Sequence, residues 1–523
     1  MDKRFGVSNI RGITDGLVEA GIDFIEIGFF QNEGFGEGKT VYLNSADAGR
    51  FIPDDKKGCL FTVLADYSRY DVSNLDEHSD DSVDAVRECF FKQERFGALD
   101  YCRIIKNKGY KLFVQPVDIL GYSDAELLSF IDELNRIEPY CLSIVDTFGS
   151  MYFEDLRRIL ELIDHNLIRT CKIGFHSHNN MQMSNALSQE FVRLTAGRRE
   201  AVVDGTLSGM GRGAGNTPTE LIAQYLSVKW HSKYNIDAIL DVIDNYMNHI
   251  RSLCQWGYST SYFVAGCYSA HVNNIAFLTK KNSIKNKDMR YILDAIGPQA
   301  RKRYDYDLLE RTYIDYMSAN IDDSEQLEKL KTIVNEKCVL ILVPGRTAKT
   351  YSENIKQYIS DNTPIVISVN FLHDRISSDF VYLSNIGRYE YWSLNEEFQK
   401  TRKILTSNLS ENAKDGDIVI SFVRLVKCGF GHMDNSVIML LRLLDRADAC
   451  KIAIAGFDGY EYIDGSLNNY YSRDLEISSV MDDNPVKLNQ EISDMLEDFR
   501  DTRENKCCNI DFITPSRFEN IFG

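Results

Sequence analysis

The stretch Cys171-Lys172-Ile173-Gly174-Phe175-His176-Ser177-His178-Asn179-Asn180 is a short apolar run that ends in two histidines. An apolar run of this length, bounded by polar residues, predicts a buried strand. Side chains alternate across a strand, so His176 and His178 point to the same side and can bind one cation. Two hydrogen-bonded histidines at a strand end are the alternative for an isolated His-X-His pair. The neighbouring segments must decide between these two interpretations.

Similar apolar runs alternate with helical stretches over the first two hundred residues. The runs that we expect to form strands are 24–29, 60–65, 83–91, 112–117, 142–146, 173–178 and 201–204. Between them, Ser123-Asp124-Ala125-Glu126 is a capping box that predicts a helix through Ile137. Strand–helix alternation predicts a parallel sheet, and eight repeats close a (β/α)8 barrel. Seven strands preceded by a helix therefore predict an α/β TIM-type barrel that lacks its first strand, with a doubly wound open sheet as the alternative.

Polar residues follow most of these expected strands. In a barrel, the carboxyl ends of the strands gather at one mouth, where the chemistry takes place. A single acid after a strand is more often a helix cap or a turn residue, so the group indicates a site more strongly than any member does. The residues that fall at this mouth are Glu26, Asp66, Arg87, Gln115, Asp118, Asp146, His176, His178 and Asp204.

Length and composition limit the class of protein. At 523 residues the chain is too long for one core, and a net charge of -18 argues against general affinity for nucleic acid or an anionic membrane. We find neither an apolar run long enough to span a membrane nor the apolar segment of a signal peptide, and so expect a cytoplasmic protein. The 12 cysteines lack C-x-x-C spacing, which predicts reduced thiols.

Four motifs together resemble a known family. They are Ile25-Glu26-Ile27-Gly28-Phe29, Val145-Asp146-Thr147-Phe148-Gly149-Ser150, the stretch Gly174 to Asn180, and Gly209-Met210-Gly211-Arg212-Gly213-Ala214-Gly215-Asn216-Thr217-Pro218-Thr219-Glu220. In this order they resemble the HMG-CoA-lyase-like (DRE-type) metal-dependent TIM barrels. That family includes 4-hydroxy-2-oxovalerate aldolase, which is the most similar member, isopropylmalate and homocitrate synthases, and the carboxyltransferase domain of pyruvate carboxylase. The resemblance covers residues 1–230.

The resemblance implies a divalent cation, Mn²⁺ or Mg²⁺, and a 2-oxo acid substrate. Carried over by position, the metal ligands are His176, His178 and Asn216, and the catalytic candidates are Glu26, Asp146 and Arg212. The implied reaction is the cleavage of a 4-hydroxy-2-oxo acid to pyruvate and an aldehyde. A cation held by imidazoles and hard oxygens suits this reaction, because it stabilises the enolate that forms next to the carbonyl.

One family motif is missing. The first strand of the family carries an Asp-x-Thr-Leu-Arg-Asp-Gly type signature, which supplies a metal-binding Asp and an enolate-binding Arg, and no such segment precedes Val7. Either the natural protein is longer or the barrel has lost this strand, and the presence of Glu26, Asp146, His176 and Asn216 favours the first explanation. Without the Arg, a site loses stabilisation of developing negative charge worth about 3 kcal/mol or more.

The remaining chain divides into two further regions. Residues 231–330 are expected to be helical, and in 331–523 strand–helix alternation returns and predicts a Rossmann-like domain. The Gly-Arg turn at Gly345 and the run Ala455-Gly456-Phe457-Asp458-Gly459-Tyr460 resemble sialyltransferase-related and pyrophosphokinase-like Rossmann domains found with surface-polysaccharide proteins. This similarity implies a nucleotide or nucleotide-sugar ligand at Gly345, Asn370 and Asp458. A non-catalytic interaction domain is the alternative.

Two functions follow from these patterns. The first is a metal-dependent carbon–carbon lyase or synthase of the aldolase type. The second is a non-catalytic barrel scaffold joined to a nucleotide-sugar-binding or transferase domain, with surface-polysaccharide biosynthesis as its setting. A biotin-dependent carboxyltransferase is disfavoured because the chain has no Ala-Met-Lys-Met motif. A homodimer is compatible with the family resemblance.

Overall fold

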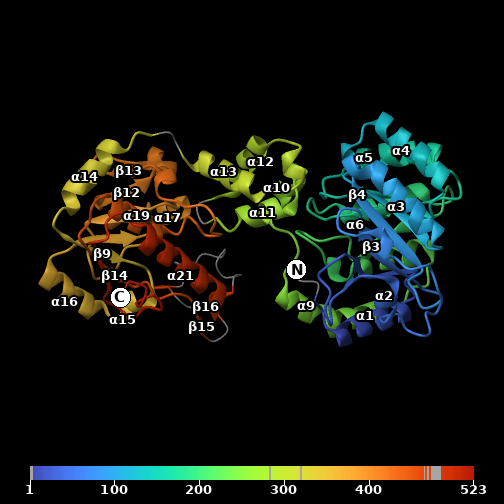
Figure 1. The fold of residues 1–523 in the computed structure, drawn as a ribbon, viewed down its shortest axis with the longest axis horizontal. Coiled ribbons are helices and arrows are strands. Elements are labelled where there is room, and N and C mark those ends of the chain that lie inside the picture. Colours follow the sequence, from blue (N-terminus) through green and yellow to red (C-terminus); the bar gives the residue numbers. More distant parts are fainter. Residues whose placement is uncertain are drawn as a thin grey trace. The chain divides into compact units, whose positions relative to one another are not determined.

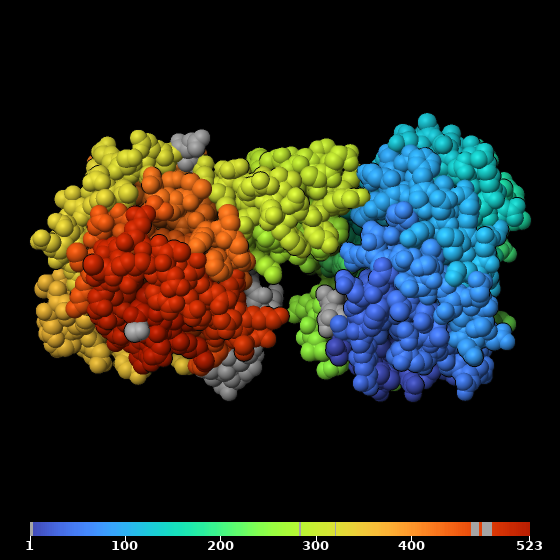
Figure 2. Space-filling view, viewed as in Figure 1, coloured from blue at the N-terminus to red at the C-terminus, as the bar shows by residue number. Residues whose placement is uncertain are grey.

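The computed structural model describes residues 4–281, 284–318, 321–463, 466–467, 470–472 and 484–522. The chain forms two compact units, Met1–Val272 and Asn273–Gly523, and each contains one large parallel sheet (Figure 1). In the space-filling view, blue to green residues build the first unit, and yellow-green to red residues build the second (Figure 2). Each unit is therefore made from one continuous stretch of chain, and residues 231–330 are divided between the two.

The first unit contains the seven expected strands. They are β1 (Phe24–Phe30), β3 (Leu60–Asp66), β4 (Ala85–Phe91), β5 (Lys111–Val117), β6 (Cys141–Asp146), β7 (Lys172–Ser177) and β8 (Ala201–Val203). An additional strand, β2 (Val41–Tyr42), has only 2 residues, too few for a recognisable sequence pattern. The helices are α1 (Val7–Glu19), α2 (Ser45–Gly49), α3 (Arg95–Asn107), α4 (Asp124–Ile137), α5 (Phe153–Asn166), α6 (Ser184–Thr195), α7 (Thr219–Trp230), α8 (Ile236–Val242), α9 (Asn248–Leu253) and α10 (Thr260–Cys267), with a π-helical turn at Ile243–Met247.

The predicted capping box opens α4. The Ser123 side chain accepts a hydrogen bond from the Glu126 backbone N–H at 3.3 Å, and the Glu126 carboxylate accepts from the Ser123 N–H at 2.9 Å. These contacts satisfy two of the N–H groups that a helix start leaves without intrahelical partners. The helix therefore begins at the residue that the sequence indicates.

The strands of the first sheet follow the order of a barrel. They lie as β2-β1-β3-β4-β5-β6-β7-β8, and all pairings are parallel. A doubly wound sheet reverses its strand order part of the way along, and this sheet does not. Among the described residues β8 pairs only with β7, so backbone hydrogen bonds do not close the sheet. The fold is an α/β TIM-like arrangement whose sheet has two free edges.

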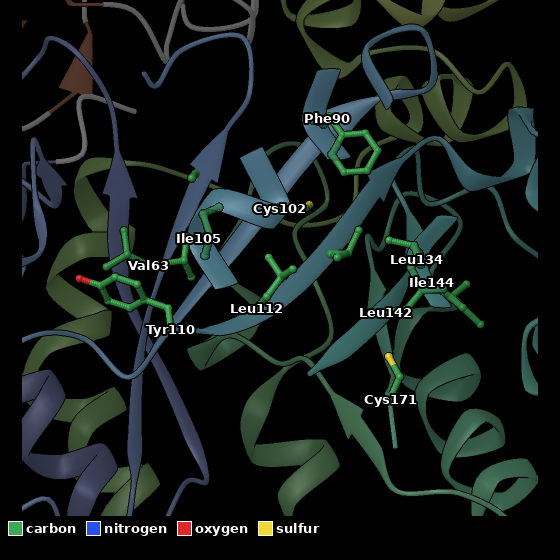
Figure 3. Packing of buried hydrophobic residues seen from close by; sticks show 14 of the residues in the cluster. Val63, Phe90, Cys102, Ile105, Tyr110, Leu112, Leu134, Leu142, Ile144 and Cys171 are labelled. Atoms are coloured by element: carbon green, nitrogen blue, oxygen red, sulfur yellow. The ribbon is translucent and has the colours of Figure 1, made fainter. Parts of the chain in front are cut away.

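Apolar side chains cover both faces of this sheet. On the helix-covered face, Cys102 and Ile105 of α3 gather with Val63 and Leu112 of the strands in the main core (Figure 3). On the other face, the rings of Phe24 and Phe113 lie 5.2 Å apart, although β1 and β5 are separated by two intervening strands. In a flat sheet that separation would be about 14 Å. The sheet must therefore curl toward its own inner face.

The second unit contains a seven-stranded parallel sheet. Its strands are β9 (Cys338–Leu342), β10 (Ile365–Val369), β11 (Phe380–Leu383), β12 (Arg402–Thr406), β13 (Ile418–Ile420), β14 (Lys451–Ala455) and β17 (Asn509–Phe512). The order is β13-β12-β11-β10-β9-β14-β17, which reverses between β9 and β14. This reversal is the switch point of a doubly wound sheet. A short antiparallel pair, β15 (Tyr462–Ile463) and β16 (Ser466–Leu467), lies outside the main sheet.

Helices precede and surround this second sheet. They are α11 (Val272–Leu278), α12 (Asn286–Ile296), α13 (Tyr306–Met317), α14 (Ser324–Val334), α15 (Arg346–Thr350), α16 (Ser352–Asn362), α17 (Ile386–Trp392), α18 (Glu396–Lys400), α19 (Ser436–Arg446) and α21 (Pro485–Thr502). Across the described part of the chain, none of the helices has the length and apolar character needed to cross a membrane. The 12 cysteines carry free thiols.

Candidate active site and metal centre

A polar layer lies on the inner face of the curled sheet, on the carboxyl-end side of the apolar layer around Phe113. Its centre is Arg87 of β4, whose side chain is 12% exposed. One guanidinium nitrogen donates to Glu26 of β1 at 2.9 Å, and another contacts the carboxylate of Asp204, just after β8. In a flat sheet, β4 and β8 would stand about 19 Å apart, so this contact again requires the sheet to curl. Side chains thus connect β8, one edge strand of the sheet, with β1, which lies beside the other edge strand, β2.

Asp204 connects Arg87 to the first histidine of the His-X-His pair. Its Oδ2 atom lies 2.8 Å from Nδ1 of His176. Burial alone would raise the pKa of Asp204, but the charges of Arg87 and His176 lower this pKa to about 2. Asp204 is therefore a carboxylate at neutral pH, and it holds the Nδ1 proton of His176. When the His176 ring is neutral, its lone pair is therefore on the other ring nitrogen, Nε2.

The second histidine is fixed by a backbone carbonyl. Nδ1 of His178 lies 3.0 Å from the carbonyl oxygen of Asp146, and burial lowers the pKa of His178 to about 3. At neutral pH the ring is uncharged, so Nδ1–H donates to the carbonyl and Nε2 has a lone pair. The rings of His176 and His178 lie 5.0 Å apart. Both rings thus offer Nε2 as a ligand.

Asn216 lies beside this pair in the Gly-rich loop after β8. It forms an isolated β-bridge with His178, and its amide nitrogen donates to the carbonyl of Met210 at 2.9 Å. Its Oδ1 atom is buried and has no hydrogen-bond partner among the described residues. A Cβ atom on Gly211 would lie 2.5 Å from the Asn216 amide nitrogen, so glycine is needed for the loop to pack against it.

These three side chains fit a divalent cation. They could supply two imidazole nitrogens and one amide oxygen. A cation held by only three protein ligands keeps open coordination positions for a substrate. The second nitrogen of each ring is held by a carboxylate or a carbonyl, which is the usual support for metal-binding histidines. Within the described residues, no group of three or more His, Cys, Asp and Glu side chains is placed to hold a metal.

The three predicted catalytic residues lie in different surroundings. Glu26 faces the mouth with 32% of its side chain exposed; burial raises its pKa, and Arg87 opposes this shift. The carboxylate of Asp146 instead accepts from the Ser150 N–H at 2.9 Å, and burial raises its pKa to about 6. Arg212 is exposed in the Gly-rich loop, and its charge contributes to the lowered pKa of His178.

Asn180 has a structural role that the sequence pattern does not indicate. Its side chain is 1% exposed, donates to the carbonyl of Phe148 at 3.0 Å and accepts from the Ala214 N–H at 3.2 Å. It therefore ties together the loops that follow β6, β7 and β8. Its position two residues after His178 in the motif is the available signal, but a polar residue in a loop motif does not reveal which loops it joins.

The residues predicted to bind a nucleotide separate into two places. The carboxylate of Asp458 accepts from the Thr347 N–H at 2.8 Å, and a Cβ atom on Gly345 would lie 2.7 Å from this carboxylate. Gly345 and Asp458 are thus neighbours at the switch point. Asn370 follows β10 and donates to the Ser436 hydroxyl at 2.9 Å. It does not line the pocket that contains Asp458.

Comparisons with known proteins identify relatives of the first unit. Residues 74–245 match the HMGL-like family model. The chain is 26% identical to an oxaloacetate decarboxylase of Mycobacterium tuberculosis over 239 residues, which cover 45% of this chain and 68% of that protein. It is also 26% identical to a 4-hydroxy-2-oxovalerate aldolase of Leptothrix cholodnii over 322 residues, which cover 59% and 89% of the two chains.

Other relatives match shorter parts of the chain, and a solved structure aligns with part of it. Identity reaches 39% over 102 residues of a 4-hydroxy-2-oxovalerate aldolase of Thermomicrobium roseum, a match that covers 20% of this chain and 26% of that protein. The matches to several such aldolases span 26% to 47% of their lengths. A hydroxymethylglutaryl-CoA lyase from Pseudomonas aeruginosa aligns with a TM-score of 0.39 and 18% identity, over 48% of this chain and 88% of that chain. Residues 74–245, which carry His176, His178, Asp204 and Asn216, thus form an HMGL-like family domain.

Proposed function

We propose that the first unit is a metal-dependent carbon–carbon lyase of the aldolase type, which cleaves a 4-hydroxy-2-oxo acid to pyruvate and an aldehyde. The HMGL-like domain and the relatives named as aldolases and a decarboxylase support an enzyme of the lyase class. The observation that carries the specific proposal is the set of three donors, because His176, His178 and the buried amide oxygen of Asn216 lie together at the mouth.

The cation that we infer would polarise the 2-oxo group and stabilise negative charge as the carbon–carbon bond breaks. Asp204 and the carbonyl of Asp146 keep Nδ1 of each histidine protonated, which leaves both Nε2 atoms for the metal. Arg212, exposed in the Gly-rich loop, is our candidate for binding the substrate carboxylate. Glu26 is the candidate for moving the proton of the 4-hydroxyl group, because its raised pKa suits acid–base exchange nearer neutral pH.

Metal binding and turnover test this proposal separately. The full chain, stripped of metal with a chelator, is titrated with Mn²⁺ and followed by electron paramagnetic resonance; pyruvate release from 4-hydroxy-2-oxo acids and from oxaloacetate is then measured. We expect saturable Mn²⁺ binding and metal-dependent pyruvate release, both abolished by His176→Ala and His178→Ala. His165→Ala is the matched control, because the side chain of His165 is 67% exposed on α5.

Asp204→Asn probes the support of the site. An amide cannot replace the charge that holds the His176 proton, so Mn²⁺ affinity should fall about 10- to 100-fold. Asp100→Asn, at a carboxylate 72% exposed on α3, should leave it unchanged. Wild-type protein that binds no cation and releases no pyruvate from either substrate would contradict the lyase proposal.

One observation favours a second candidate function, in which the barrel is a non-catalytic scaffold. Arg87 already engages both inner carboxylates, Glu26 and Asp204, so neither is available to the cation without breaking an ion pair. Mn²⁺ that binds at His176 and His178 without any pyruvate release would favour this scaffold function.

A further inference from the structure

The second unit has a pocket at the switch point of its sheet. The pocket has a volume of about 280 Å³ and lies outside the carboxyl ends of β9, β14 and β17. It is lined by Arg346, Thr347, Asp458, Gly459, Glu461, Pro515, Ser516, Arg517 and Glu519. Doubly wound sheets bind ligands in the crevice at this position, because the chains leaving the two central strands turn in opposite directions there. The topology thus supplies a place for a ligand.

Two guanidinium groups converge in this pocket on one carboxylate. Nη2 of Arg346 lies 2.9 Å from Oε1 of Glu461, and Nη2 of Arg517 lies 2.9 Å from Oε2 of the same residue. The two arginines lie 171 positions apart in the sequence, and they hold the Glu461 carboxylate between them. Their side chains are 49% and 50% exposed, and that of Glu461 is 38% exposed. Ion pairs this exposed contribute little to stability, so an incoming anion can displace Glu461 at small cost.

Backbone geometry keeps the second arginine in the pocket. Gly459 has a φ angle of 87°, in the left-handed region, and a Cβ atom there would lie 2.9 Å from Cδ of Arg517. The Arg517 N–H donates to the carbonyl of Asp458 at 3.3 Å, and the Ser516 hydroxyl donates to the carbonyl of Phe457 at 2.6 Å. These contacts fix the segment after β17 against the segment after β14. Arg517 is therefore held next to Arg346 by the fold.

Asp458 does not compete for the guanidinium groups. Its two carboxylate oxygens accept from the backbone N–H and the hydroxyl of Thr347. Burial raises the pKa of Asp458, and the hydrogen bonds from Thr347 oppose this shift. The remaining carboxylates that line the pocket, Glu461 and Glu519, can accept hydrogen bonds from hydroxyl groups of a ligand.

We propose that this pocket binds a phosphorylated small molecule, whose phosphate replaces the Glu461 carboxylate between Arg346 and Arg517. Phosphate suits this position because its several oxygens can accept from both planar guanidinium groups at once. The pocket is larger than one anion, so the ligand carries a further polar group such as a sugar. The site belongs to the second unit and does not depend on the lyase activity proposed for the first.

Binding to the full chain tests the site directly. Orthophosphate, pyrophosphate, ribose 5-phosphate and uridine diphosphate are titrated calorimetrically at low ionic strength, with malonate as a carboxylate probe. We expect saturable binding of at least one phosphorylated probe, weakened about tenfold or more by Arg346→Gln and by Arg517→Gln. The phosphorylated probe that binds most tightly identifies whether a monoester, a diphosphate or a nucleotide is preferred.

Glu461→Gln should change the affinity in the opposite direction. Removing the internal carboxylate frees both guanidinium groups, so this variant should bind the phosphorylated probe more tightly than the wild type. Arg402→Gln is the matched control, because Arg402 begins β12, which lies next to the edge strand β13 on the far side of the sheet from the pocket. Equal thermal unfolding of all variants shows that they are folded. The proposal is overturned if no phosphorylated probe binds, if malonate binds as tightly, or if Glu461→Gln weakens binding.

Discussion

Glu88 illustrates how one residue can make the first unit sensitive to pH. It lies on the helix-covered side of β4 with 1% of its surface exposed, and its Oε1 atom has no hydrogen-bond partner in the part of the chain that the structure describes. Burial, and then the nearby charge of Asp66, raise the pKa of Glu88 well above its ordinary value. The folded protein therefore keeps this carboxyl protonated at pH values where the unfolded chain has released the proton.

Glu88→Gln should stabilise the protein at alkaline pH. Below the pKa of the unfolded chain, both states hold the proton and the contribution of Glu88 is fully present; as pH rises toward the folded pKa, this contribution is lost. The variant cannot ionise, so its unfolding free energy should exceed that of the wild type by about 1 kcal/mol or more at pH 8. Urea unfolding at pH 5 and pH 8 measures the difference, with Glu154→Gln, exposed on α5, as the control. A difference that shrinks as pH rises would contradict this account.

Some residues of the candidate site could be predicted from the sequence, but one contact between them could not. The His-X-His pair and Asn216 follow from strand alternation and a family motif, both of which are local in the sequence. The Arg87–Asp204 contact joins residues 117 positions apart, and it exists only because the sheet curls. Sequence position placed both residues at the same mouth but gave no indication that they pair.

At the scale of elements, α1 packs unusually closely against α8 and the π-helical turn that follows it. A Cβ atom on Gly16 would lie 2.1 Å from Cγ2 of Val242, and one on Gly12 would lie 2.2 Å from the Tyr246 ring. Glycine normally weakens a helix interior by about 1 kcal/mol relative to alanine. Here the missing side chains allow the two helices to touch.

Gly16→Ala should therefore destabilise the first unit despite the better helix propensity of alanine. The methyl group overlaps Val242, and overpacking of this kind costs about 1–3 kcal/mol. Val242→Ala in the same chain should recover part of the loss, because it removes the atoms that collide. Thermal unfolding of the two single variants and the double variant forms the cycle. Additive effects of the two substitutions would contradict a direct contact.

Elements also differ in how clearly the sequence predicts them. The seven barrel strands are apolar runs between helices, and all were expected. In the second sheet, the sequence pattern indicated no strand at β11, β12 or β17. β12 begins Arg402-Lys403, and charged residues normally indicate a surface segment. Lys403 is nevertheless 1% exposed, because its ammonium group bends back to the carbonyl of Thr401 at 2.7 Å. The hydrophobic periodicity of the sequence does not reveal such a local hydrogen bond.

At the scale of the whole molecule, the two compact units should unfold separately. Each has its own sheet and its own hydrophobic clusters. Gly345 offers a probe in the second unit, because a Cβ atom there would lie 2.1 Å from the backbone oxygen of Gly456, which cannot move aside as a side chain could.

Calorimetry of the full chain should show two transitions. Gly16→Ala should lower the midpoint of one transition only, and Gly345→Ala should lower the midpoint of the other, by several °C for a change of about 2 kcal/mol. A single transition that both substitutions shift equally would show that the units unfold as one cooperative body.

The free edges of the first sheet have a consequence for the candidate metal centre. β8 has 3 residues and bonds to β7 alone among the described strands, and Asp204 follows it directly. Backbone amides at such an edge exchange with solvent most readily, since few neighbours must separate to expose them. The carboxylate that orients His176 thus directly follows an edge strand, where local unfolding is easy. Transient opening there would release the imidazole from its fixed tautomer, so a cation bound at the proposed site would be retained less well whenever this short strand separates from β7.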